Sequence, residues 1–194
     1  DFTMVSGIEQ SPFDKGTVYV AATRYKLDDY EPYLFVTRDY GQTWKRIDNG
    51  IERDHFTRVI RADPTTPGLL FAGTEVGMYV SFDDGEHWER FQLNLAVSPV
   101  HEILIKNEDL VVGTHGRAIW ILDDISPLRQ IAAGIADGDH LFAPRETIRF
   151  PVGIDWSAGV PGYVSYMSTR TGAFLETKDT NGAMSRQWLD SGAN

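Results

Sequence analysis

An eight-residue segment recurs in this chain, and the interval between its copies restricts the possible folds more than any other feature. Residues 37–44 return as residues 81–88, and a weaker third copy follows at 121–125, where an isoleucine stands in place of a glycine. A period of about 40–45 residues is typical of a four-stranded propeller blade. The matching positions, each pair 44 residues apart, are Asp39 and Asp83, Gly41 and Gly85, and Trp44 and Trp88.

Short alternating segments between these copies indicate strands. One repeat predicts strands at 56–62, 69–72, 78–82 and 88–91, and the next predicts them at 101–105, 110–113 and 118–122. No long segment has the 3.6-residue period of a helix, so any helix is expected to be a short turn. The sequence therefore predicts an all-β fold in which residues 1–130 form four-stranded antiparallel propeller blades. We name the strands of each blade A to D, from the central axis outwards.

The repeated residues suit a hairpin turn between strands C and D. An aspartate can accept hydrogen bonds from the backbone of its own turn, and glycine can adopt a positive φ. A tryptophan can pack its ring between neighbouring sheets. Catalysis by Asp39 and Asp83 is the competing interpretation, but residues repeated in equivalent turns usually serve the repeat itself. We therefore expect structural roles for Asp39, Gly41, Trp44, Asp83, Gly85 and Trp88.

The repeated segment resembles the Asp-box, or bacterial neuraminidase repeat, of sialidases, xyloglucanases and sortilin-type propellers. Residues 21–30, 73–75 and 114–124 are similar to a family of bacterial proteins described as glycosyl hydrolase-like or sortilin-like. The resemblance covers residues 5–150. It implies tandem propellers, a following β-rich region and a secreted or periplasmic location, and it leaves the chemistry open.

In a propeller, the B–C and D–A connections lie at one edge, and the repeated C–D turns lie at the other. The first B–C connection, at 24–33, has eight more residues than its counterpart in the second blade. Long loops are frequent sites of function, so this edge is the expected ligand-binding face. The D–A connections would add Asp54, His55 and His101. The expected ligand-binding residues are Arg24, Tyr25, Tyr30, Tyr33, His115 and Arg117.

Two functions are compatible with these residues. The first is a scaffold that binds a peptide, a protein or a glycan, and it needs no complete active site in this segment. The second is part of a glycoside hydrolase acting on an extracellular polysaccharide, which needs two carboxyl groups about 5–10 Å apart. A solvated or blade-packing role for the same residues is a third reading. The candidate acid and base residues are Asp28, Asp29, Glu31 and Glu75.

Composition excludes several other classes. The net charge of −10 and the scattered basic residues argue against nucleic acid and anionic membranes as partners. No segment has the roughly 20 apolar residues of a membrane span. The chain has no cysteine, and its five histidines show no close ligand pair along the sequence, so we expect neither a metal nor a cofactor.

Beyond the blades, residues 131–140 are small and polar, as in a linker. Residues 141–194 form a tail that is extended, irregular or β-rich, and the resemblance places a further β domain after it. Alternation over 140–150 predicts one strand. Because a propeller needs about four blades to close, we also expect a partner, either the remainder of the same propeller or other copies of this chain.

Overall fold

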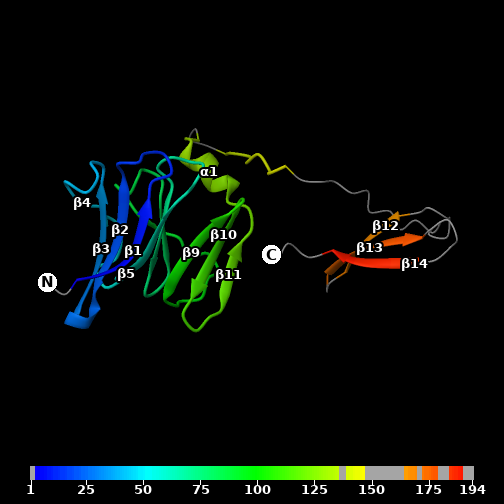
Figure 1. The fold of residues 1–194 in the computed structure, drawn as a ribbon, viewed down its shortest axis with the longest axis horizontal. Coiled ribbons are helices and arrows are strands. Elements are labelled where there is room, and N and C mark those ends of the chain that lie inside the picture. Colours follow the sequence, from blue (N-terminus) through cyan, green and yellow to red (C-terminus); the bar gives the residue numbers. More distant parts are fainter. Residues whose placement is uncertain (1–2, 136–138, 147–163, 170–171, 179–183, 190–194) are drawn as a thin grey trace. The chain divides into compact units, whose positions relative to one another are not determined.

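The computed structural model describes residues 3–135, 139–146, 164–169, 172–178 and 184–189. The chain divides into two compact units, Asp1–Arg145 and Glu146–Asn194. Nearly all regular structure in both units is β-strand (Figure 1), which confirms the predicted all-β class.

Two four-stranded antiparallel sheets open the first unit. Their strand orders, β1-β2-β3-β4 and β5-β6-β7-β8, follow the chain. Each sheet is therefore a simple succession of hairpins, as in a propeller blade. The strands of the first sheet are β1 (Met4–Gln10), β2 (Val18–Arg24), β3 (Asp29–Thr37) and β4 (Lys45–Arg46), and those of the second are β5 (Thr57–Ala62), β6 (Leu70–Thr74), β7 (Met78–Ser81) and β8 (Glu89–Arg90).

A third sheet has three strands among the described residues, in the order β9 (Val100–Lys106), β10 (Asp109–Thr114) and β11 (Ile119–Leu122). Its C–D turn begins like the other two, because Tyr40, Asp84 and Asp124 all have a positive φ, between 58° and 63°. The third turn then diverges, since the residue after Asp124 is a fully buried isoleucine rather than a glycine.

A short helix, α1 (Ser126–Ala132), follows this turn, and no periodic pattern in the sequence indicates it. Its proline lies in the first turn, where the missing N–H has no intrahelical partner to lose. Leu128 and Ala132 pack against the core cluster between the second and third sheets. The helix lies at one end of the blades, near β9 and β10 (Figure 1), and its Arg129 pairs with Asp63 of the second blade at 2.9 Å.

The hydrophobic core lies between successive sheets. One cluster joins the first and second sheets and includes Leu34, Val36 and Tyr79. Another joins the second and third sheets and includes Phe71 and Ile103. Burial of these faces is the main favourable contribution to folding. It fixes the three sheets in chain order as consecutive blades.

The innermost strands of the three sheets are tied together by one arginine. Arg61 of β5 pairs with Glu9 of β1 at 3.4 Å and with Glu102 of β9 at 2.5 Å. Its Nε also donates to the backbone oxygen of Ile103 at 3.0 Å. Burial raises the pKa of Glu9, although the Ala62 N–H and Arg61 oppose this. These contacts link β1, β5 and β9 along the axial side of the blades.

Two expectations about loops and strands were wrong. The segment 24–33 is not an open loop, because β3 begins at Asp29 and pairs with β2 as far as Arg24. Only residues 25–28 connect the strands, as a 3-10 turn, so the extra residues lengthen the hairpin. In addition, residues 140–146 of the predicted strand 140–150 have no regular structure, and 147–150 lie outside the described residues.

The second unit contains one three-stranded antiparallel sheet, in the order β12 (Val164–Thr169), β13 (Gly172–Lys178) and β14 (Met184–Leu189). Its strands pair in register without a bulge. The tail is therefore β-rich where it is described. Across the described residues, no helix has both the length and the apolar character needed to cross a membrane.

Candidate functional site: a cluster contributed by three blades

Hydrogen bonds bring the B–C connections next to the first residues of the inner strands. The Glu75 N–H donates to the Phe56 oxygen at 3.1 Å, and the His115 N–H donates to the Pro99 oxygen at 2.8 Å. The repeated C–D turns lie at the opposite ends of the C strands. Each residue of a C strand adds about 3.3 Å to the distance between its C–D turn and its B–C connection. We call the edge formed by the B–C connections and the starts of β5 and β9 the B–C edge.

At this edge an aromatic pair joins the first and second blades. Tyr25, in the turn after β2, stacks on Phe56 with ring centroids 5.2 Å apart and an interplanar angle of 15°. Phe56 is buried, whereas Tyr30 beside it is 49% exposed. The guanidinium of Arg58 lies 4.9 Å from the Phe56 centroid and 5.5 Å from that of Tyr25. Cation–π contacts of this kind hold the arginine over the rings.

Arg58 also forms an ion pair within the second blade. Its Nε lies 2.5 Å from Oε2 of Glu75, and both side chains are partly buried. The pair holds the Glu75 carboxylate beside the guanidinium that lies over the aromatic rings. Glu75, a candidate acid or base from the sequence, is therefore neutralised by a neighbouring cation in this structure.

Two histidines of the third blade complete the arrangement. The rings of His101, on β9, and His115, in the B–C connection, have centroids 5.3 Å apart. Burial lowers the pKa of His101, the charges of Arg58 and His115 lower it further, and Glu75 opposes them. The histidines thus lie within electrostatic range of the arginine of the second blade. We define the three-blade cluster as Tyr25, Phe56, Arg58, Glu75, His101 and His115.

The carboxylates of the first hairpin are also engaged by cations. Asp29 lies 3.3 Å from Arg24 and accepts a hydrogen bond from the Tyr33 hydroxyl at 2.8 Å. That hydrogen bond is the main cause that lowers the pKa of Asp29. Glu31 pairs with Arg46 at 3.0 Å and with Arg53 at 3.1 Å. For Asp29, a role as the general acid of a glycosidase would need the opposite environment, one that raises its pKa.

The remaining sequence candidates have no comparable setting. Asp28 is exposed and adopts a left-handed backbone conformation, with φ 57°, where it ends the turn after β2. Arg117 is exposed, and its backbone oxygen accepts a hydrogen bond from the Trp120 indole at 2.8 Å. The guanidinium carbon of Arg46 lies 4.7 Å from the centroid of the Tyr33 ring, so Arg46 covers one face of that ring.

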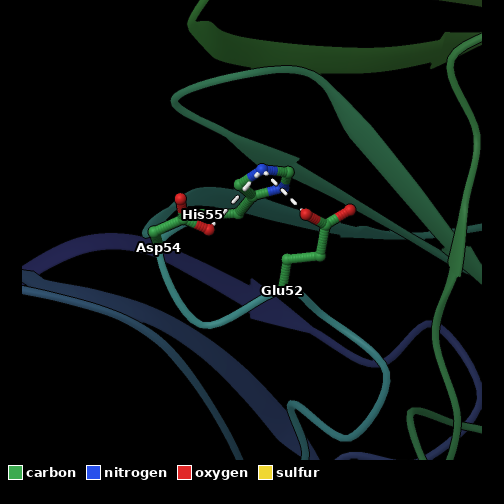
Figure 2. A group of neighbouring side chains, drawn as sticks. All are labelled: Glu52, Asp54 and His55. Atoms are coloured by element: carbon green, nitrogen blue, oxygen red, sulfur yellow. Dashed lines mark ion pairs between the residues drawn. The ribbon is translucent and has the colours of Figure 1, made fainter.

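A second group at the same end of the blades surrounds a buried histidine. Glu52, Asp54 and His55 lie in the D–A connection that leads to β5, and Figure 2 shows both carboxylates directed at the imidazole. Nε2 of His55 is 3.5 Å from Glu52 Oε2 and 3.8 Å from Asp54 Oδ1. The expectation of no metal rested on the spacing of the histidines alone, and it did not consider the carboxylates next to His55 in the sequence.

The repeated turns hold their aspartates inside the turn. Asp39 accepts hydrogen bonds from the Thr43 N–H at 2.8 Å, the Thr43 hydroxyl at 2.6 Å and the Thr37 hydroxyl at 2.8 Å. Asp83 is bound in the same way by Ser81 and His87. Gly41 and Gly85 both have φ 86°. The two tryptophans differ, because Trp88 is buried between two sheets while Trp44, expected to pack likewise, is 50% exposed.

Sequence reasoning missed two members of the three-blade cluster, Phe56 and Arg58. Both looked like ordinary positions at the start of a strand, and only the packing of neighbouring blades brings them to Tyr25 and Glu75. His101, noted where the D–A connection meets the predicted strand 101–105, lies on β9. Its partner His115 is 14 residues away in sequence, so no local spacing could indicate the pair.

No protein family profile matches the chain, and no curated protein does. Solved structures do match. An ancestral GH74 enzyme gives a TM-score of 0.51 at 14% identity over 96% of this chain. A GH74 xyloglucanase from Xanthomonas campestris gives 0.48 at 17% identity over 94% of this chain. YCF48 bound to D1 peptide gives 0.41 at 19% identity over 57% of it.

These structures are β-propellers. The likeness to the ancestral GH74 enzyme, together with the succession of antiparallel blades, shows that this chain has a propeller fold. The chain spans 27% of the length of that enzyme, 28% of the xyloglucanase and 32% of YCF48.

Proposed function

We propose that this chain is a segment of a ligand-binding β-propeller, and that its B–C edge is the surface that contacts the ligand. The observation that carries the proposal is the three-blade cluster, in which aromatic, cationic and imidazole side chains from three successive blades meet. A cluster assembled from separate blades depends on their correct packing, so it is a feature of the whole fold rather than of one loop. The resemblance adds a secreted or periplasmic location to this proposal.

A peptide with carboxylate groups is the ligand class that the exposed side chains of the third blade favour. The chain as a whole carries a net charge of −10. At the B–C edge, however, Glu75 is paired with Arg58, while His101, His115 and Arg117 are exposed. Cationic and imidazole donors beside an exposed tyrosine suit carboxylate recognition with some apolar contact. A glycan would use the same tyrosine, so it is the alternative ligand that a test must separate.

The test is binding to an array of immobilised peptides that vary in net charge and in the presence of a C-terminal carboxylate, run beside a glycan array. We expect acidic peptides to bind and His115→Gln and Tyr30→Ser to weaken this binding about tenfold or more. His87→Gln and Tyr40→Ser are matched controls on the repeated turns and should leave it unchanged. Equal loss in all four variants, or binding to the glycan array alone, would contradict the peptide proposal.

The alternative, part of a glycoside hydrolase, finds less support at this edge. Asp29, Glu31 and Glu75 each lie within 3.3 Å of an arginine. A polysaccharide-release assay with Asp28→Asn, Asp29→Asn, Glu31→Gln and Glu75→Gln variants separates the two functions. Release that disappears in any of these variants while folding is retained would favour the hydrolase.

We further propose that another sheet covers the outer face of the first blade. Val5, Ile8 and Trp44 on this face are 55%, 67% and 50% exposed, and they line an open apolar groove. The equivalent face of the second blade is covered by the first blade, which buries Trp88. The covering sheet would come from the remainder of the same propeller or from another copy of this chain.

A further inference from the structure

We propose that Glu52, Asp54 and His55 form a binding site for a divalent transition-metal ion, with Zn²⁺ as the ion of choice. The three donors come from one short connection, between β4 and β5, and their ligand atoms all lie within 4.8 Å of one another. The site is separate from the three-blade cluster and is not needed for the proposed peptide binding.

The histidine is held in place for this role. Its side chain is only 9% exposed. Its ring packs edge-on against Tyr79, with centroids 5.9 Å apart, and Nδ1 lies 2.6 Å from the Tyr79 hydroxyl. When Nδ1–H donates to that hydroxyl, the lone pair of Nε2 points at the carboxylates. Metal-binding histidines commonly have such an outer partner, which fixes the tautomer and the ring orientation.

The other ring nitrogen lacks a close partner. Nε2 is 3.5 Å from Glu52 Oε2 and 3.8 Å from Asp54 Oδ1, beyond the usual 2.7–3.2 Å of an N–H···O hydrogen bond. In the part of the chain that the structure describes, it makes no hydrogen bond. Donors bonded to one tetrahedral ion at about 2.0–2.2 Å lie roughly 3.3–3.6 Å from each other. The observed spacing therefore admits an ion between the three groups after small side-chain movements.

The carboxylates are free to make those movements. They are 55% and 84% exposed, whereas a turn closed by the His55 N–H and the Glu52 oxygen, at 3.0 Å, fixes the backbone between them. Arg90 approaches Glu52 at 3.4 Å, but it does so at Oε1, the oxygen that faces away from the histidine. One imidazole and two carboxylates match the ligands that zinc accepts, and they leave at least one coordination position open.

The experiment is calorimetric titration of the protein with ZnCl₂, together with the ¹⁵N chemical shift of the His55 ring. We expect one ion per chain and a large shift of the Nε2 resonance. Glu52→Gln and Asp54→Asn should each weaken binding at least tenfold, while Glu89→Gln, an exposed glutamate of β8 outside the site, should not. Tyr79→Phe removes the hydroxyl that contacts His55 Nδ1 and accepts from the Glu52 N–H, and it should weaken binding about 10- to 100-fold.

Three results would overturn the proposal. They are the absence of measurable Zn²⁺ binding, equal affinity in Asp54→Asn and wild type, and loss of binding in His115→Gln, which would place the ion at the His101–His115 pair instead. Peptide binding by the three-blade cluster is measured separately in metal-free buffer, so failure of one proposal does not resemble failure of the other.

Discussion

The indole Nε1 of Trp88 donates a hydrogen bond to the backbone oxygen of Ile47 at 2.5 Å. Trp88 belongs to the second blade and Ile47 to the connection that leaves the first, so this bond joins neighbouring blades. Ile47 also packs against Gly85, where an added Cβ would lie 2.7 Å from Ile47 Cδ1. The glycine and the tryptophan of the repeated turn therefore serve blade packing as well as the turn itself.

Trp88→Phe should destabilise the protein by about 1–3 kcal/mol, because it leaves the Ile47 oxygen buried without its donor and reduces the packing between blades. Trp44→Phe should cost less than about 0.5 kcal/mol, since Trp44 is half exposed. Urea unfolding of both variants measures the difference. Equal midpoints for the two variants would contradict this account of the interface.

Asp39 should titrate well below an ordinary aspartate. Hydrogen bonds from the Thr43 hydroxyl, the Thr43 N–H and the Thr37 hydroxyl lower its pKa to about 2. The unfolded value is about 3.9, so the stabilisation from this carboxylate is complete above that pH and is lost as the pH falls through about 2. Carboxyl ¹³C NMR measures the titration directly.

The stability difference between wild type and Asp39→Asn should accordingly shrink as the pH is lowered from about 4 to about 2. A midpoint near 4 for the Asp39 carboxyl, or a difference independent of pH over this range, would show that the turn hydrogen bonds are not formed in solution.

The His101 titration reports on the three-blade cluster. Burial and the nearby charges of Arg58 and His115 lower the pKa of His101, and Glu75 raises it. Arg58→Gln should therefore raise the pKa of His101, and Glu75→Gln should lower it further. Ring ¹H NMR measures both shifts. Arg90→Gln, a change in an exposed arginine that does not contribute to this shift, is the control and should leave the titration unchanged.

Self-association tests the proposal that a further sheet covers the first blade. If copies of this chain supply that sheet, light scattering should show oligomers, and Trp44→Glu should convert them to monomers because it places a charge in the apolar contact. Lys45→Gln removes an exposed charge that pairs with Glu86 of the second blade and should have a smaller effect. A concentrated wild-type sample that stays monomeric, with its Trp44 fluorescence fully quenched by acrylamide, would exclude copies of the chain as the covering partner.

The repeat predicted the blades well because strand position and turn chemistry are local properties. The strands β5 to β11 lie within a few residues of where alternation placed them. The longer first hairpin was misread as a loop, since its tyrosines and carboxylates look like surface residues although they pair as β3. The helix α1 was missed because it has only seven residues, too few to show a helical period.

The candidate site was only partly predictable. Tyr25, Glu75 and His115 were found from their place in the B–C connections. Arg58 was not, because its role depends on the aromatic rings of the neighbouring blade and on an ion pair 17 residues away. The cation partners of Asp29 and Glu31 likewise come from packing between hairpins. These contacts place both carboxylates in ion pairs, which the sequence did not indicate.

NMR chemical-shift mapping with an acidic peptide selected on the array tests the central claim most directly. Binding at the B–C edge predicts that the largest perturbations fall on Tyr30, His101 and His115, with little change at residues 37–44 and 81–88. Perturbations concentrated in those repeated turns, or spread evenly over the blades, would contradict the assignment of the three-blade cluster as the ligand-binding surface.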